Sequence, residues 1–185
     1  MNVTVFEAIN ITKKYRNTLA LNQVSMSVMQ GDIYGFIGEN GAGKTTMIRL
    51  LTGLAEPTTG KIALFGESNK KLAKQRERIG CIIESPSLYL DMTAYENLEV
   101  QRLQRGIPGK GCIDNALALV GLKDTGKKKA KDFSLGMRQR LALAIALLGN
   151  PEFLVLDEPI NGLDPTGIIE LRNLLKRLNK ERGIT

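Results

Sequence analysis

The chain contains no histidine and no tryptophan, and aromatic residues make up 5% of its 185 residues. Its two cysteines, Cys81 and Cys112, do not have the spacing of a metal site, and no histidine accompanies them. We therefore expect two buried thiols in a reducing compartment. Because the basic residues are not interleaved with aromatic ones, we expect no nucleic-acid partner.

A long apolar run is also missing. The longest, residues 141–148, is far shorter than the ~18 residues that a membrane-spanning helix needs. Residues 1–5 lack the basic and apolar segments of a signal peptide, so we expect a cytosolic chain whose membrane role would come through a partner. The net charge is +7, but the basic residues are spread along the sequence, which is typical of solvated surface. With 43% apolar residues, the chain is long enough for one domain with a sizeable core.

The strongest motif is the segment 38–45, which reads G-x-x-x-x-G-K-T. A short apolar, β-prone stretch at 33–37 precedes it, and apolar residues at helical spacing follow it as far as a stop at Gly53. This order of strand, glycine loop and helix is the context that a phosphate-binding loop requires. The alternative is a glycine-rich turn that binds nothing.

The residue types of this loop suit a triphosphate. Glycines let the backbone N–H groups approach the phosphates, and the first turn of the helix adds free donors and partial positive charge. Lys44 is expected to reach the β- and γ-phosphates, and the Thr45 hydroxyl to ligate Mg²⁺. The expected nucleotide-binding residues of the loop are Gly38, Asn40, Gly41, Ala42, Gly43, Lys44, Thr45 and Thr46.

A second motif lies near the C-terminus. Residues 153–156 are four apolar residues that predict a buried strand, and Asp157 and Glu158 follow at its end. Ligands gather at the carboxyl ends of parallel strands. We therefore expect Asp157 to hold Mg²⁺ and Glu158 to take a proton from the attacking water. The alternative is an acidic turn at a strand end.

Three further positions have two interpretations each. Glu84 ends an apolar run, 79–84, that is typical of a strand covered on both faces, and its carboxylate could face Mg²⁺ and water or lie in a solvated loop. Tyr15 could stack on adenine or be an ordinary half-buried strand residue. Ser134 predicts the N-cap of a helix that continues to residue 148, and this helix start could be a second anion site or a plain cap.

The remaining pattern predicts an antiparallel β opening, followed by several helices. Residues 3–11 and 20–28 alternate in hydropathy, and a short strand is expected at 60–66. Helices are expected at 70–78, 93–104, 113–120 and 166–182, the second opened by a capping box of Thr93 and Glu96. Residues 53–59 and 106–111 are candidate hinges.

Taken together, the motifs resemble the nucleotide-binding domain of an ATP-binding-cassette (ABC) transporter over nearly the whole chain. Tyr15 falls where the family keeps its adenine-stacking aromatic residue, which favours that interpretation. The segment 134–140, with Ser134 and Gly136 at the phosphate-facing positions, falls where the family signature lies. Residues 161–164 fall at the loop that contacts the second domain of a dimer.

The sequence departs from this family in several places. Leu135 and Met137 stand where glycine and glutamine are common, and Glu84 stands where a glutamine is usual. The last of these resembles the exporters of peptide antibiotics, such as bacitracin and lantibiotics. The family also uses a histidine on a strand after the last helix, and this sequence contains neither, so we expect a C-terminally truncated domain with weak turnover.

The resemblance implies an α/β fold. It has a phosphate-loop NTPase core with a mostly parallel sheet, an N-terminal antiparallel β subdomain and an inserted helical subdomain. The single domain, 1–185, would divide into a core, 1–86 and 149–185, and a helical part, 87–148. Two such domains, as a homodimer or heterodimer, would pair head to tail around ATP and Mg²⁺. The catalytic residues would be Glu158, Lys44 and Glu84, and the metal would be held by Thr45, Asp157 and Glu84.

The implied partner is a transmembrane permease subunit, which would hold the chain at the inner face of the cell membrane and export a peptide antibiotic or a similar amphiphile. Three other functions remain open at this point. One is a soluble ABC-type ATPase, another is a different phosphate-loop enzyme such as a kinase or GTPase, and the third is a fragment that binds ATP without turnover. The sequence contains no guanine-reading N-K-x-D string.

Overall fold

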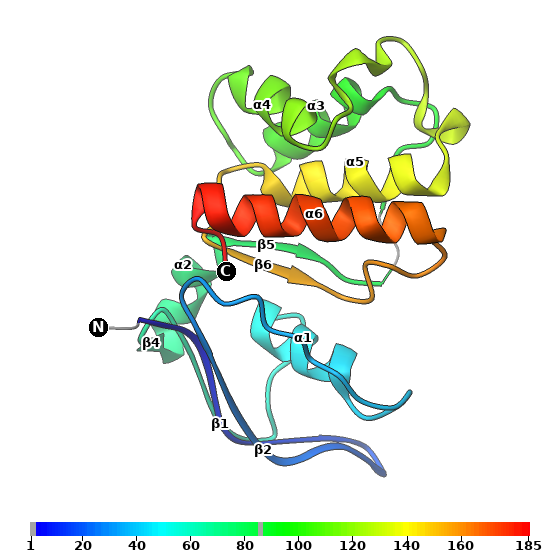
Figure 1. Ribbon diagram of the computed structural model, residues 1–185. Helices are drawn as coiled ribbons and strands as arrows, with labels where there is room; N and C mark the ends of the chain where they lie inside the picture. Colours follow the sequence, from blue (N-terminus) through cyan, green and yellow to red (C-terminus); the bar gives the residue numbers. More distant parts are fainter. Residues whose placement is uncertain (1–2, 85–86) are drawn as a thin grey trace.

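The computed structural model describes residues 3–84 and 87–185, which form two β-sheets covered by helices (Figure 1). The strands are β1 (Thr4–Tyr15), β2 (Thr18–Met29), β3 (Thr59–Leu64), β4 (Glu67–Ser68), β5 (Ile79–Ile82) and β6 (Phe153–Leu156). The helices are α1 (Lys44–Thr52), α2 (Leu72–Arg76), α3 (Ala94–Gln104), α4 (Gly111–Leu119), α5 (Leu135–Leu147) and α6 (Pro165–Arg182). Short 3-10 turns lie at Asn69–Lys71, Lys123–Thr125 and Ala130–Asp132.

The N-terminal sheet is antiparallel in the order β2-β1-β3-β4, as the alternating sequence predicts. β1 turns back into β2 at the pair Tyr15 and Thr18, and its other edge pairs with β3. One face of this sheet packs on α1, where Phe6, Leu50 and Leu64 are fully buried. The fold therefore places the hairpin and the phosphate-loop helix against each other.

The second sheet is the parallel pair β5 and β6, with Ile79 opposite Phe153 and Ile82 opposite Leu156. The helix α5 covers one face so closely that a Cβ at Gly80 would lie 2.2 Å from the carbonyl oxygen of Ala146. Both strands end at the same edge, because parallel strands run in the same direction. Consequently Glu84 and Asp157, which follow the two strands, lie toward the same end of this sheet.

Two expectations about β5 are wrong. Its Cys81 side chain is exposed, and Cys112 on α4 is only partly buried, so the two are not buried thiols. The apolar run 79–84 is also not covered on both faces. The physical reason is that α5 covers the face of Gly80 and Ile82, whereas the other face is covered only at Ile79, which packs on the core of the antiparallel sheet, and not at Cys81.

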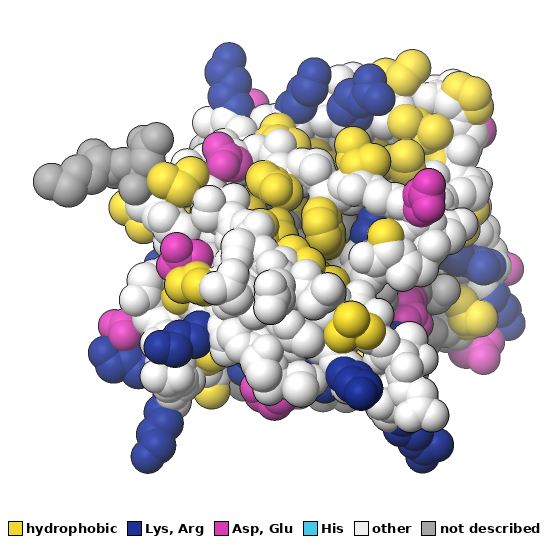
Figure 2. Space-filling view, turned by 90° about the horizontal axis from the view of Figure 1, so that it is seen from below, with side chains coloured by type: hydrophobic (Ala, Val, Ile, Leu, Met, Phe, Trp, Pro, Cys, Tyr) yellow, Lys and Arg dark blue, Asp and Glu magenta, His cyan; other side chains and the backbone are white. Residues whose placement is uncertain are grey.

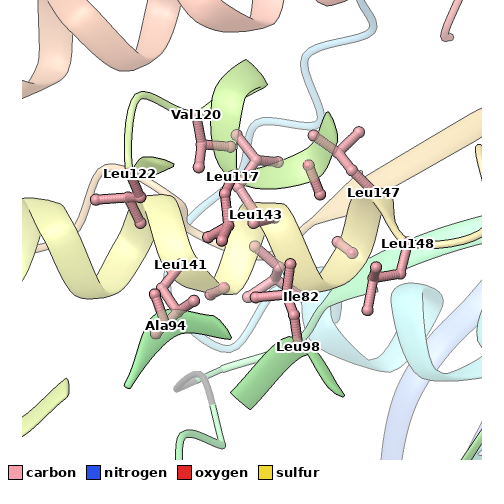
Figure 3. Packing of buried hydrophobic residues seen from close by; sticks show 14 of the residues in the cluster. Ile82, Ala94, Leu98, Leu117, Val120, Leu122, Leu141, Leu143, Leu147 and Leu148 are labelled. Carbon is pink, nitrogen blue, oxygen red and sulfur yellow. The ribbon is translucent and has the colours of Figure 1, made fainter. Parts of the chain in front are cut away.

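The helices α3, α4 and α5 pack around one apolar cluster, which includes Leu98, Leu117 and Leu141 and is shown in Figure 3. The predicted capping box opens α3: the Thr93 hydroxyl accepts the backbone N–H of Glu96, and the Glu96 carboxylate accepts that of Thr93. In Figure 1 this cluster lies on the opposite side of β5 and β6 from the antiparallel sheet. The boundaries of a helical subdomain at 87 and 148 stay a prediction.

The strand expected at 33–37 does not form. These residues are exposed, Ile37 to 93%, and none of the described strands pairs with them. A strand needs neighbouring backbone partners, and here an apolar groove of about 750 Å³ separates the segment from β6. The groove is lined by residues of the sheet, of α1 and of α6, among them Phe6, Val28, Met47, Val155 and Leu178.

Thr185 pairs with β6 along the edge that does not face β5. The backbone N–H of Thr185 donates to the Glu152 carbonyl at 3.0 Å, and the Thr185 carbonyl accepts the Leu154 N–H at 2.9 Å. This is the pattern of a single parallel bridge opposite Phe153. Because α6 ends at Arg182 and Gly183 adopts a left-handed conformation with φ 66°, the chain turns back onto the sheet at this point.

The basic side chains are spread over the surface, as their spread along the sequence predicts. Seen from below, hydrophobic side chains gather near the middle of the face in Figure 2, and lysine and arginine side chains stand apart from one another around its edge. Within residues 3–84 and 87–185, none of the helices has the length and hydropathy needed to cross a membrane.

Candidate functional site

The phosphate loop ends in a left-handed glycine that starts α1. Gly43 is the N-cap residue, with φ 91°, and a Cβ there would lie 2.5 Å from the Ala20 carbonyl oxygen on β2. Only glycine accepts both this conformation and this close approach. The helix ends at Gly53, which is also left-handed, as the sequence predicts. The free N–H groups at the start of α1 therefore point toward the exposed loop 38–42.

Lys44 folds back over the loop that precedes it. Its ammonium donates to the carbonyl oxygens of Gly38, at 2.7 Å, and of Glu39, at 2.9 Å. The loop is closed by a bond from the Ala42 N–H to the Glu39 carbonyl at 3.1 Å. An anion that enters the loop would offer this ammonium charged oxygens in place of neutral carbonyls, and such charge-assisted bonds are the stronger ones. The position of Lys44 thus fits its predicted role.

The two predicted metal ligands, Thr45 and Asp157, meet directly. The Thr45 hydroxyl donates to Oδ2 of Asp157 at 2.9 Å, although the residues are 112 positions apart. Asp157 is 5% exposed, and its backbone N–H continues the ladder to the Ile82 carbonyl. A hydroxyl and one carboxylate fit Mg²⁺, which usually takes one or two protein carboxylates and completes its shell with phosphate and water. Within the described residues, no group of three or more acidic, histidine or cysteine side chains could hold a metal by itself.

Glu158 follows at the rim of the same site. Its backbone is left-handed, with φ 47°, and its side chain is exposed. The amide of Asn161 donates to its carboxylate. An exposed carboxylate next to the metal-ligand candidate Asp157 is suitably placed to accept a proton from water. Its role as a base stays a prediction.

Glu84 also has a left-handed backbone, with φ 59°, but its carboxylate does not join Thr45 and Asp157. It forms an ion pair with the guanidinium of Arg49 on α1, and both side chains are partly exposed. The structure thus brings Glu84 to the helix of the phosphate loop, not to Thr45 or Asp157. The sequence prediction missed Arg49, although its place four residues after Thr45 puts both on one face of α1.

Tyr15 ends β1 at the hairpin that lies against the phosphate loop. Its side chain is 41% exposed, and the ammonium of Lys13 stands 4.7 Å from the centre of the ring. The ring is therefore neither buried in the core nor covered on every face, so a flat aromatic ligand has access to it. Its stacking on adenine stays a prediction.

Ser134 is the N-cap of α5, as predicted. Its hydroxyl accepts the Met137 N–H at 3.3 Å, and the residue is exposed. Leu135 beside it is 50% exposed, and Gly136 is partly exposed. The free N–H groups at the start of α5 therefore face solvent, where another molecule can reach them.

Two polar contacts of this region could not be found from sequence. Gln139 lies between Arg138 and Arg140 on α5, and its amide donates to the Pro159 carbonyl at 2.9 Å. Asn161 was expected only as part of a contact loop, yet it holds Glu158. A glutamine between two arginines gives no sequence signal of its burial or of the carbonyl that it meets.

Comparison with known proteins agrees with this geometry. The family model described as "ABC transporter" matches residues 21–161. The chain belongs to the ABC transporter family. It is 50% identical over 183 residues to the bacitracin transport ATP-binding protein BcrA of Bacillus licheniformis, a match that covers 98% of this chain and 60% of that protein. It is 43% identical over 176 residues to the lantibiotic transport ATP-binding protein SrtF of Streptococcus pyogenes, covering 95% and 75%.

Solved structures share the fold. The structure of cbiO1 from Clostridium perfringens, part of the transporter complex cbiONQ, has a TM-score of 0.89 at 30% identity, covering 99% of this chain and 76% of that one. The dimeric ATP-binding cassette MJ0796 bound to ADP and phosphate has a TM-score of 0.82 at 27% identity, covering 97% and 85%. The predicted family and fold class are confirmed. The chain spans about 60% of the length of the BcrA proteins that it matches.

Proposed function

We propose that this chain is the ATP-binding and ATP-hydrolysing part of an ABC exporter that moves a peptide antibiotic or a similar amphiphile through a separate membrane subunit. The observation that supports this most directly is the bond between Thr45 and Asp157, which joins the phosphate-loop helix to the end of β6. It brings the two motifs for phosphate binding and water activation to one edge of the parallel sheet. The similarity to BcrA and SrtF supports the substrate class.

In the proposed site, residues 38–46 surround the triphosphate, and Lys44 leaves its carbonyl partners for the β- and γ-phosphates. Tyr15 stacks on the adenine. Thr45 and Asp157 hold Mg²⁺, which when bound supplies positive charge beside the phosphate oxygens. Ser134 and Gly136 of a second copy, or of a similar domain, approach the γ-phosphate from the other side, because the start of α5 is exposed.

The chemical step is the hydrolysis of the terminal phosphoanhydride. A water oxygen attacks the γ-phosphorus, and Glu158 accepts a proton from that water. The bond between the γ-phosphorus and the bridging oxygen breaks, and ADP leaves with the electron pair. Two copies would separate afterwards, because the phosphate that joined them is gone. Through its membrane partner, the chain would lie at the inner face of the cell membrane.

A thermal-shift comparison tests nucleotide binding. A ligand at about 100 times its Kd stabilises the folded state by roughly 2.7 kcal/mol. We expect MgATP to raise the melting temperature of the unaltered protein and not of a Lys44→Ala variant, and GTP to have a smaller effect. Equal shifts in both proteins would contradict the proposed site.

A cellular assay tests the transport function separately. Deleting the gene should raise the sensitivity of its host to a peptide antibiotic, and the unaltered gene should restore resistance while Lys44→Ala should not. An unchanged sensitivity to a panel of such peptides, in a host where ATP binding has been demonstrated, would contradict the substrate class alone.

A further inference from the structure

The amide of Gln139 is one of the few buried polar side chains in the described part of the chain. It is 9% exposed and lies on α5 between Arg138 and Arg140, just before the apolar half of that helix. Its Nε2 donates to the carbonyl oxygen of Pro159 at 2.9 Å. Pro159 directly follows Glu158, the proposed base. A buried amide whose partner is removed leaves an unsatisfied polar group, so this contact fixes where the carbonyl lies.

The turn that carries Glu158 has few other supports. Within it, the N–H of Asn161 donates to the Glu158 carbonyl at 3.1 Å and the N–H of Leu163 to the Ile160 carbonyl at 3.1 Å. Among residues 3–84 and 87–185, Gln139 is the one side chain from outside residues 158–163 that forms a hydrogen bond to them. The left-handed backbone of Glu158, with φ 47°, is of the kind that surrounding structure must hold in place.

The start of α5 packs on the same turn. A Cβ at Gly162 would lie 2.8 Å from a methyl carbon of Leu135, and one at Gly136 would lie 3.8 Å from a methyl carbon of Leu163. The helix therefore contacts the turn at Leu135 and Gln139, the first through a methyl group beside Gly162 and the second through a hydrogen bond.

We propose that Gln139 is a positioning residue for ATP hydrolysis: it holds the Pro159 carbonyl and thereby sets the place of the Glu158 carboxylate. This inference rests on the proposed function of the chain. Gln139 does not touch substrate and acts only through the turn 158–163. Its contribution is geometric, and a displacement of about 1 Å at a reacting group can cost roughly 100-fold in rate.

The same helix links this turn to the proposed dimer contact. Ser134 begins α5 and Gln139 follows five positions later, which is about 7.5 Å along a helix that rises 1.5 Å per residue. A second copy that docks on the Ser134 end would therefore contact the same helix that carries Gln139.

The test replaces Gln139 by leucine, which keeps the volume and removes the donor. Single-turnover hydrolysis of MgATP, with the full-length protein in excess, gives the rate, and a fluorescent ATP analogue gives the Kd. We expect Gln139→Leu to hydrolyse roughly 10 to 100 times more slowly while its Kd changes less than about twofold. The matched control is Asn179→Leu, which removes an amide that donates to the Gly31 and Ile184 carbonyls away from this turn and should keep the rate.

A double-mutant comparison separates positioning from general structural damage. In a Glu158→Gln background, Gln139→Leu should cost nothing further, because the base through which it acts is already absent. An equal loss in both backgrounds, or an unchanged rate in the single variant, would overturn the inference while the proposed function stands. Absence of hydrolysis by the unaltered protein would contradict the proposed function itself, and the inference with it.

Discussion

The Thr45 hydroxyl donates to Oδ2 of Asp157 at 2.9 Å, so this bond joins the first turn of α1 to the end of β6. Both oxygens are the ones that we assign to Mg²⁺. The metal would therefore replace a bond that already orients its two ligands, and little reorganisation is needed to form the site. Preorganisation of this kind reduces the entropic cost of binding.

The first prediction concerns this pair. Thr45→Val keeps the shape of the side chain and removes the hydroxyl, so we expect the enhancement of ATP binding by Mg²⁺ to fall, while binding measured in EDTA stays within about twofold. Calorimetric titration with and without Mg²⁺ measures both. The control is Thr52→Val on the same helix, whose hydroxyl donates only to the carbonyls of Ile48 and Arg49. If Mg²⁺ enhances ATP binding to Thr45→Val as much as to the unaltered protein, Thr45 is not a metal ligand.

The second prediction concerns Glu158. Loss of a general base typically costs roughly 10²–10⁴ in rate, and the amide of a Glu158→Gln variant cannot accept the proton. We expect this variant to bind ATP, hydrolyse it poorly and remain dimeric with ATP, because the bridging phosphate persists. Size-exclusion chromatography with light scattering measures the dimer, and phosphate release measures the rate. Turnover at the rate of the unaltered protein would exclude Glu158 as the base.

The third prediction compares two helix caps. Ser134→Ala and Thr93→Ala each remove a hydroxyl that accepts a backbone N–H, from Met137 and Glu96, so each should destabilise the fold by about 0.5–2 kcal/mol. Only Ser134→Ala should also weaken the ATP-dependent dimer in the Glu158→Gln background. Denaturant unfolding gives the stability and light scattering gives the dimer. Equal dimerisation of the two variants would show that Ser134 only caps α5 and does not bind the nucleotide of a second copy.

Sequence reasoning succeeded where local pattern and local chemistry coincide. The glycines at 43 and 53 bound α1, and the caps Thr93 and Ser134 open their helices as expected, because each signal acts within one turn. These caps are features that a short window of residues determines. The bond between Thr45 and Asp157 spans 112 positions, and it agrees with the shared metal role that the two motifs predict.

Sequence reasoning failed where the structure of a residue depends on contacts with elements that are distant in the sequence. Residues 33–37 have the composition of a strand, but a strand exists only with backbone partners, and the groove beside them leaves them unpaired. Cys81 lies in an apolar run, yet no neighbouring element covers its side chain. Glu84 was expected among the catalytic and metal-binding residues, but its carboxylate pairs with Arg49, a side chain from a different element that local pattern does not reveal.

The fourth prediction follows from this unpaired segment. Ile37 is 93% exposed, so Ile37→Ala should change the free energy of unfolding by less than about 0.5 kcal/mol. Leu50 on α1 is fully buried, and Leu50→Ala should cost about 2–5 kcal/mol through lost transfer energy and the cavity left behind. Urea unfolding of the 185-residue chain measures both. A cost above about 2 kcal/mol for Ile37→Ala would mean that the segment is packed in solution.

The fifth prediction concerns pH. The hydrogen bond from the Arg102 guanidinium lowers the pKa of Glu99 below its ordinary value of 4.5, although burial acts in the opposite direction. A carboxylate whose pKa is lower in the folded state stabilises the protein above the pKa of the unfolded state, and this stabilisation is lost as the pH falls through the folded value. The stability difference between the unaltered protein and Glu99→Gln should therefore be constant from pH 7 to about 5 and shrink below about 4.5.

The Arg102→Gln variant lacks the partner of Glu99, so it should lose the same pH-dependent contribution to the free energy of unfolding. Denaturant unfolding from pH 3 to 7 measures all three proteins, and a difference that persists undiminished to pH 3 would show that the pair does not set this carboxylate's pKa.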